Sequence, residues 1–300
     1  MNIDECEEGA RQKLLDRFRR LQRDNSIGNR IKIIITSRPH VDVELNLPDV
    51  VIIPLDNTNL KKDIADFVTT EASKLTKFPV ALREEIQQTL INGADGMFLW
   101  VSLIIDGLQK STTTRPRVIR EKLRSLPKTL PGLYTDILRK IKPEDQEYAT
   151  AILRWVVWAV RPLTLQELTI AVAIRPEDTS MSSLKGEMEL DLGKVLRLLF
   201  GPLINIRGGE VHLVHQSAKD FLRPVESTEG SPHDCSGFLS CLCATESNLH
   251  LTVRCLTYLS FDEFEEGPVD AIYGWGNLKT RLQKAQFLAY AATNWSEHMT

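Results

Sequence analysis

The chain has 300 residues, 42% of them hydrophobic, and a formal net charge of −3. This length allows about two domains, and the nearly balanced charge gives no general case for binding nucleic acid or an anionic membrane. Five cysteines are an odd number, and the pair Cys241 and Cys243 stands too close for a zinc-binding C-x-x-C. The first residues are acidic and polar, unlike a secretory signal. We therefore expect a soluble cytoplasmic protein with reduced thiols, no metal site and no membrane partner.

A strand buried on both faces is predicted at residues 31–35, where the sequence reads Ile-Lys-Ile-Ile-Ile. Short apolar runs of this kind are typical of parallel sheets. Pro39 cannot donate to a sheet, so the strand ends before it and Arg38 stands at its carboxyl end, where open α/β sheets bind ligands. The guanidinium fork suits a phosphate, although an ordinary surface arginine is an equal alternative. A second strand is predicted at residues 50–55.

An acidic pair, Asp4 and Glu5, precedes this strand and is followed by an amphipathic helix through Leu14, Leu15, Phe18 and Leu21. The order of acidic residues, helix, hydrophobic strand and Thr-Ser-Arg-Pro resembles the second half of a NACHT-type ATPase core, in the STAND class of P-loop NTPases. The resemblance implies that Asp4 and Glu5 serve magnesium binding and water activation, and that Arg38 senses the γ-phosphate.

The same resemblance is incomplete at its start. The first aspartate of the family's acidic pattern has no counterpart, and no G-x-x-x-x-G-K-[ST] phosphate loop occurs in the chain. The resemblance therefore implies an N-terminally truncated member. ATP or ADP with magnesium belongs to the intact family member, and we expect neither a bound nucleotide nor catalysis in this chain.

Apolar spacing next predicts helices at residues 60–75 and 82–90, and a buried helix from Gly96 to Leu108. The string Gly-Met-Phe-Leu-Trp-Val that opens this last helix resembles a signature of the helical subdomain of fungal NACHT proteins. A further helix is predicted to start near Pro131, since proline is favoured in a first helical turn.

Three helices and a hairpin follow. A helix is predicted from Glu144 to Ala159, a second begins at the capping box of Thr164 and Glu167, and a third runs from Leu192 to Leu199. The hairpin has strands at 203–206 and 210–214 around a glycine turn. This order is that of a winged helix, and the segment resembles the winged helix shared by fungal NACHT proteins and GPI inositol-deacylase-like proteins.

His215 follows the hairpin in the string His-Gln-Ser-Ala-Lys-Asp-Phe-Leu. The resemblance implies that His215 reaches the bound diphosphate, with Asp220 one turn further on. A histidine that bonds only to local backbone is an equal alternative. A Ser217–His215 nucleophilic pair is a third hypothesis, but the chain has no G-x-S-x-G elbow.

The predicted fold is mainly α with a small α/β remnant: a partial P-loop NTPase sheet (1–56), a helical subdomain (57–143), a winged helix (144–224) and a helical spacer (225–300). The spacer resembles the segment that precedes ankyrin repeats in such proteins. The expected function is that of a fragment of a NACHT-type signal-transduction ATPase, with protein partners and self-oligomerisation. A non-enzymatic interaction scaffold is the alternative. DNA binding is disfavoured because the third helix offers only Lys194 and Arg197.

Overall fold

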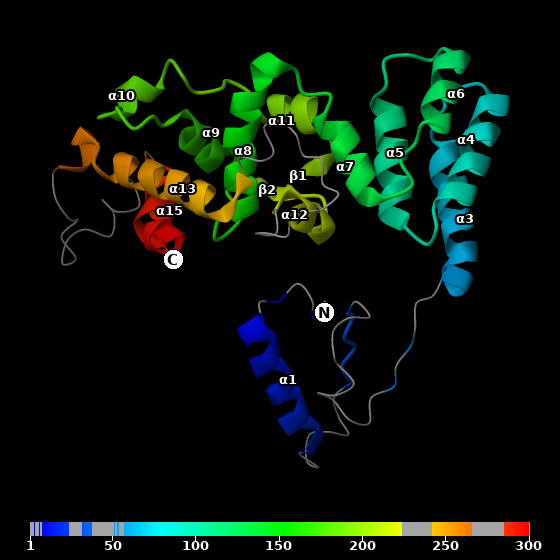
Figure 1. Cartoon of the computed structure of the whole chain (residues 1–300), viewed down its shortest axis with the longest axis horizontal. Helices are drawn as coiled ribbons and strands as arrows, with labels where there is room; N and C mark the ends of the chain where they lie inside the picture. Colours follow the sequence, from blue (N-terminus) through cyan, green and yellow to red (C-terminus); the bar gives the residue numbers. More distant parts are fainter. Residues whose placement is uncertain are drawn as a thin grey trace, which may run out of the picture. The chain divides into compact units, whose positions relative to one another are not determined.

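The computed structural model describes residues 3, 6, 8–23, 32–37, 51, 53, 57–223, 242–265 and 285–299. The chain divides into two compact units, Met1–Leu60 and Lys61–Thr300. Helices dominate both, and the one sheet among the described residues is a two-stranded hairpin (Figure 1). The prediction of a mainly α protein with a small sheet is confirmed.

The first unit contains helix α1 (Glu8–Arg23) and a small apolar cluster. Ile3 and Leu15 are buried there, and Leu14, Phe18 and Ile35 pack against them. The Ile3 amide donates to the Thr36 carbonyl at 2.9 Å, which links Ile3 to the segment of residues 32–37.

The prediction of a strand buried on both faces at residues 31–35 is wrong for its described part. Residues 32–37 are not part of a described strand, and a bridge is assigned at Thr36. Ile33 is 45% exposed and Ile34 is 82% exposed. A parallel strand needs neighbours on both edges and cover on both faces, and among the described residues Ile3 is the one that bonds to this segment.

The second unit begins with a group of five helices, drawn at the right of Figure 1. They are α3 (Asn57–Ser73), α4 (Val80–Gly93), α5 (Phe98–Lys110), α6 (Pro116–Arg124) and α7 (Leu130–Leu138). The apolar residues expected on one face of α4, namely Leu82, Ile86 and Leu90, are its buried residues.

Trp100, in the apolar string that opens α5, links three parts of this helical group. Its indole donates to the Pro127 carbonyl at 2.7 Å, and its ring lies against the backbone of Gly93, where an added Cβ would come within 2.8 Å. Gly96, with φ of 80°, makes the turn into the helix. The tryptophan thus joins α4, α5 and the segment before α7.

The predicted winged helix is present. Its helices are α8 (Gln146–Trp158), α9 (Leu165–Ala173) and α11 (Leu192–Phe200), and the one-turn helix α10 (Met181–Leu184) lies between α9 and α11. Strands β1 (Ile204–Arg207) and β2 (Glu210–Leu213) pair antiparallel around Gly208 and Gly209, both with positive φ, and helix α12 (Gln216–Leu222) follows.

Two further helices pack onto the winged helix. They are α13 (Ala244–Leu259) and α15 (Leu288–Asn294), continued by a 3-10 turn at Trp295–Met299. An aromatic cluster joins them to α8: the fully buried Trp155 contacts the rings of Phe287 and Tyr290 at 5.5 and 5.8 Å between centroids. Burying aromatic rings of this size is a main source of stability in such a core.

Among the described residues, no helix is long and apolar enough to cross a membrane, and no group of acidic, His or Cys side chains is arranged to hold a metal ion. Cys255 is buried, and this burial raises the pKa of its thiol to about 12. It therefore acts as a packing residue.

Candidate functional site

His215 is the predicted site residue that the structure describes, and it lies where β2 turns into α12. The preceding residue is tied back to the sheet, since the Val214 amide donates to the Leu203 carbonyl at 2.9 Å. His215 is the N-cap of α12, and its Nδ1 accepts the Ser217 amide at 3.1 Å. This bond satisfies one of the free amides of the first helical turn.

Ser217 connects this turn to α7. Its Oγ lies 2.9 Å from Nδ1 of His215 and 2.8 Å from the hydroxyl of Tyr134. Tyr134 is fully buried and its ring contacts Phe221 at 5.5 Å. Burial raises the pKa of Tyr134, and the bond to Ser217 offsets this only in part. A buried hydroxyl therefore fixes the position of the His215 turn.

The tautomer of His215 follows from these contacts. Because Nδ1 accepts the Ser217 amide, the proton of the neutral ring belongs on Nε2. The side chain is exposed, and Nε2 makes no hydrogen bond to any residue in the described parts of the chain. The turn thus presents an N–H donor outward, which suits a phosphate or carboxylate oxygen.

Ser217 and His215 lie as close together as a nucleophile and its general base, but His215 cannot act as the base. A general base needs a lone pair for the serine proton, but the single lone pair of Nδ1 already receives the Ser217 amide. The contact is a local helix cap. Asp220 accepts from the Gln216 side chain at 2.8 Å through Oδ1, and its charge adds to the rise in the pKa of Tyr134.

The other three predicted site residues, Asp4, Glu5 and Arg38, lie outside the described residues. Their neighbours Ile3 and Thr36 are described and hydrogen-bonded to each other, but this contact does not position the three side chains. Their roles remain predictions.

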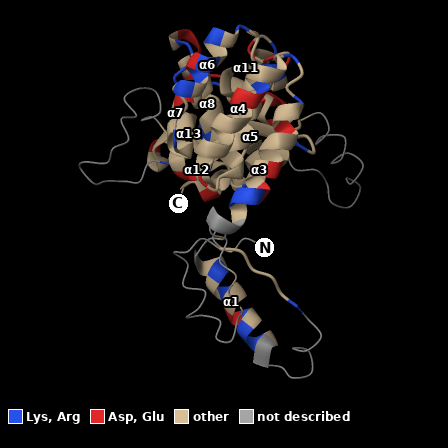
Figure 2. Ribbon diagram, turned by 90° about the vertical axis from the view of Figure 1, so that its right-hand side faces the viewer, with Lys and Arg blue, Asp and Glu red and all other residues tan. Residues whose placement is uncertain are grey.

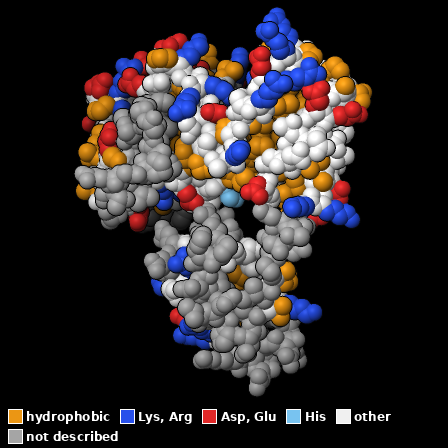
Figure 3. Space-filling model, turned by 45° about the vertical axis from the view of Figure 1, so that its right-hand side comes forward, with side chains coloured by type: hydrophobic (Ala, Val, Ile, Leu, Met, Phe, Trp, Pro, Cys, Tyr) orange, Lys and Arg blue, Asp and Glu red, His pale blue; other side chains and the backbone are white. Residues whose placement is uncertain are grey.

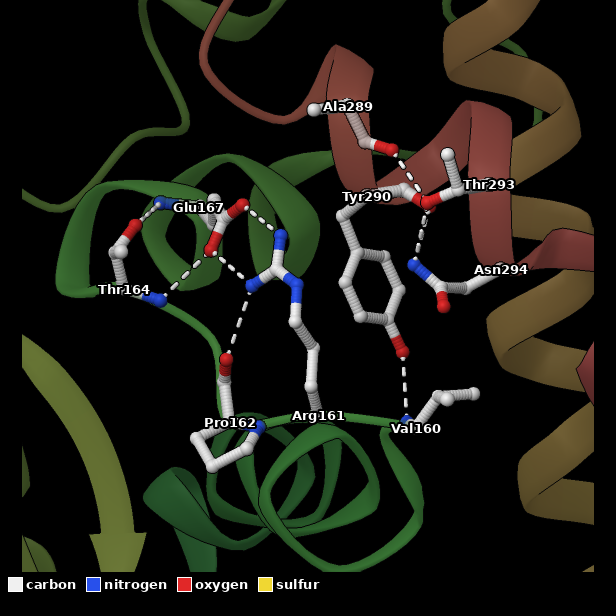
Figure 4. A network of polar contacts seen from close by, with 9 residues as sticks. All are labelled: Val160, Arg161, Pro162, Thr164, Glu167, Ala289, Tyr290, Thr293 and Asn294. Carbon is white, nitrogen blue, oxygen red and sulfur yellow. Dashed lines mark hydrogen bonds and ion pairs between the residues drawn. The ribbon is translucent and has the colours of Figure 1, made fainter.

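A polar joint between the winged helix and the C-terminal helices was not predicted (Figure 4). Glu167 completes the expected capping box by accepting the Thr164 amide at 2.8 Å, and its two oxygens also accept from Arg161 at 3.0 and 2.6 Å. Burial acts to raise the pKa of Glu167, but the bonds from Arg161 and Thr164 outweigh it and hold the pKa below its usual value.

Tyr290 of α15 forms the other half of the joint. Its hydroxyl accepts the Val160 amide at 3.0 Å and lies 3.0 Å from Nε2 of the buried His298, while the Arg161 guanidinium lies over its ring at 5.1 Å. Nδ1 of His298 lies 3.3 Å from Oδ1 of Asn248 in α13. The capping box was predicted from sequence. The contact with Tyr290 was not, because Tyr290 lies 123 residues after Glu167 and leaves no local sequence signal.

A second cluster joins α8 to α13. Arg154 pairs with Glu246, and its Nη1 lies 3.4 Å from Nδ1 of His250, whose Nε2 faces Nε of Arg254 at 3.5 Å. Burial first, and then the two arginine charges, lower the pKa of His250 to about 4. The histidine is therefore neutral near pH 7, and the cluster serves packing of α13 on α8.

Comparisons with known proteins agree with this architecture. The family described as "GPI inositol-deacylase, winged helix domain" matches residues 139–229. The vegetative incompatibility protein HET-E-1 of Podospora anserina is 29% identical over 238 residues, which are 76% of this chain and 17% of that protein. The chain thus spans about a sixth of the length of this relative. No solved structure matches. The two matches show a winged-helix similarity at residues 139–229 and a similarity to a fungal protein over most of the chain.

Proposed function

We propose that this chain is part of a nucleotide-dependent signalling switch of the NACHT and STAND type, and that the segment ending at α12 is the winged helix of that switch. The order of sequence motifs, the winged-helix match and the similarity to HET-E-1 support this proposal. In such a switch, exchange of ADP for ATP releases a closed state and allows assembly with protein partners.

One observation carries the proposal: His215 lies at the end of the wing with an exposed side chain whose Nδ1 is hydrogen-bonded within the turn, while Nε2 bonds to none of the described residues. In the proposed switch, Nε2–H donates to a phosphate oxygen of the nucleotide. The rigid link through Ser217 to the buried Tyr134 then passes the position of that phosphate to α7.

The described residues do not make a complete nucleotide site. They supply one donor, and the chain contains no phosphate loop to hold the rest of the ligand. Phosphoryl transfer depends on positioning and charge stabilisation around a held triphosphate, so we derive no catalytic step. Arg38 as γ-phosphate sensor and Asp4 and Glu5 as magnesium-side carboxylates are part of the proposal for the longer protein.

The test is an NMR titration of the chain with ¹⁵N-labelled histidine against Mg–ADP, with inorganic pyrophosphate as a second probe. Without a phosphate loop the chain is expected to retain no nucleotide, so the expected contact is weak: the ring signals of His215 should move only at millimolar ligand. His212 is the internal control, because it lies on the neighbouring strand and its Nε2 already faces Glu210 at 3.3 Å. Equal shifts at both histidines, or none at His215, would contradict the proposed contact.

A hydrolysis assay tests the second part of the proposal. The chain alone is expected to release no phosphate from ATP above the rate of a buffer blank. Phosphate release that disappears in Glu5→Gln would show that the chain is an enzyme after all.

A non-enzymatic interaction scaffold is the second candidate. It is favoured by an exposed apolar stripe on α13, where Leu249, Val253 and Leu256 are 63%, 36% and 42% exposed. DNA binding is not favoured, because α11 carries only Lys194 and Arg197 with Asp191 at its start.

A further inference from the structure

The second unit carries opposite charges at its two ends. Helix α6 and its flanks form one end, which we call the basic end, residues 115–128. Its six exposed cations are Arg115, Arg117, Arg120, Lys122, Arg124 and Lys128, and its one acidic residue is Glu121. In a protein with a net charge of −3, this concentration of positive charge is not a consequence of composition.

Two of these cations form ion pairs, and the charge of Arg124 also acts on Glu85. Arg120 pairs with Glu85 at 2.7 Å and Arg117 pairs with Glu121 at 3.6 Å. Within the described parts of the chain, Arg115, Arg124 and Lys128 make no ion pair. Figure 2 shows blue positions on α6, and Figure 3 shows Lys and Arg side chains gathered at the upper right of the face it draws.

The opposite end, which we call the acidic end, consists of residues 175–191 and 262–265. The two segments are joined, because the Asp262 amide donates to the Thr179 carbonyl at 2.9 Å and Glu263 accepts the Met181 amide at 2.9 Å. The carboxylates of this end are Glu177, Asp178, Glu187, Glu189, Asp191, Asp262, Glu263 and Glu265. Its cations are Arg175, which pairs with Glu187, and Lys185.

An exposed apolar side chain stands within the acidic end. Leu190, between Glu189 and Asp191, is 102% exposed. Protein–protein contacts commonly combine a buried apolar side chain with a surrounding polar rim. Leu190 supplies such an apolar side chain in the acidic end.

The two ends lie far apart within the unit. Figure 1 draws α10, in the acidic end, toward the left of the second unit and α6 toward its right. The acidic end of one molecule therefore cannot neutralise the basic end of the same unit, but it can neutralise that of another molecule.

We propose that the second unit associates head to tail, with the basic end of one copy docked on the acidic end of the next. The contact is heterologous, so repetition of it gives a ring or an open filament rather than a two-fold dimer. Complementary charge steers such encounters and selects the partner. A nucleic acid fits less well, because residues 115–128 contain no aromatic side chain for base stacking.

This inference adds the contact surface to the assembly step of the proposed function. The contact proposed here lies between two charged protein surfaces and contains no nucleotide, so its test omits ATP and ADP. The result is independent of whether His215 contacts a phosphate.

The test is sedimentation velocity of the full chain at low and at high salt. The screening length falls from about 30 Å at 0.01 M to about 3 Å at 1 M ionic strength, so self-association is expected to weaken at least tenfold over this range. Association that is absent at low salt, or that does not change with salt, overturns the inference.

Charge-reversal variants identify the surfaces. R115E/R124E lowers the net charge of the basic end from +5 to +1, and E189K/E265K changes that of the acidic end from −6 to −2. Each variant alone is therefore expected to associate more weakly than the unaltered chain. Mixed in equal amounts, the two are expected to form a complex, because opposite ends are restored between them. R139E/K140E reverses two exposed charges on the segment after α7 and is expected to associate like the unaltered chain.

Two outcomes of the variant experiment contradict the inference. One is unchanged association in both end variants; the other is failure of the mixture to form a complex although both variants keep the far-UV spectrum of the unaltered chain. Binding of a short DNA duplex that is lost in R115E/R124E, without self-association of the unaltered chain, would assign the basic end to nucleic acid instead.

Discussion

The first unit and the winged helix are both rich in branched apolar residues, yet they use them differently. In the first unit Ile34, Val51 and Ile53 are 82%, 88% and 77% exposed. In the winged helix Ile152, Val157 and Leu196 are 0%, 0% and 1% exposed. The described apolar residues of the two predicted strands of the first unit lie mostly in solvent, whereas the helices of the winged helix pack against one another and against α13. Apolar residues therefore stabilise a fold only where the fold buries them.

The largest expected effect comes from Trp155→Ala. The ring contacts Phe287, Tyr290 and His298, so its removal leaves a cavity between α8 and the C-terminal helices. We expect a loss of about 3–5 kcal/mol in the free energy of unfolding, measured by urea denaturation. Ile34→Ala is the matched control in the first unit and should change the free energy by less than about 0.5 kcal/mol. Comparable losses for both substitutions would remove the contrast between the two regions.

The next effect depends on pH. The pKa of His250 is about 4 in the folded protein and 6.5 as the ordinary value, so the unfolded state binds the proton first as pH falls. The contribution of neutral His250 to the free energy of unfolding is therefore complete above pH 6.5. It decreases as the pH falls, by about 3 kcal/mol at pH 4. Unfolding measured at several pH values should show this slope, and His250→Gln should flatten it. A variant with the slope of the unaltered chain would mean that other groups cause it.

A smaller effect is expected from Arg161→Ala at the joint of Figure 4. The substitution leaves the buried Glu167 with only the Thr164 cap. Because Arg161 is 43% exposed, we expect the substitution to lower the free energy of unfolding by about 1–2 kcal/mol. This is less than the cost of breaking a fully buried ion pair. Hydrogen exchange should then show faster opening of α15. Arg139→Ala, an exposed arginine without an ion pair in the described residues, is the control.

The smallest effect is expected from Ser217→Ala. This change removes the bond between Tyr134 and the His215 turn but keeps the backbone amide that caps α12. Loss of one such bond should cost about 0.5–1.5 kcal/mol, measured by thermal unfolding. A loss near that of Trp155→Ala would show that the turn is part of the main core.

Local patterns in the sequence were sufficient for much of this fold. The capping box at Thr164 and Glu167, the glycine turn of the hairpin and the buried face of α4 were all predicted, because each depends on residues within one helix or turn. His215 was also recognised from its neighbours, and its position at a helix start follows from the end of β2.

Tertiary structure decided the rest. Exposure of Ile33 and Ile34 depends on whether other strands surround them, which an apolar run cannot specify. The partner of Ser217 is Tyr134, 83 residues earlier, and the partner of Val160 is Tyr290, 130 residues later. Neither pair leaves a periodic signal, because such contacts form only when helices distant in sequence pack together. The separation of charge between α6 and α10 likewise became visible only when the chain was folded, since it depends on which segments reach the two ends of the unit.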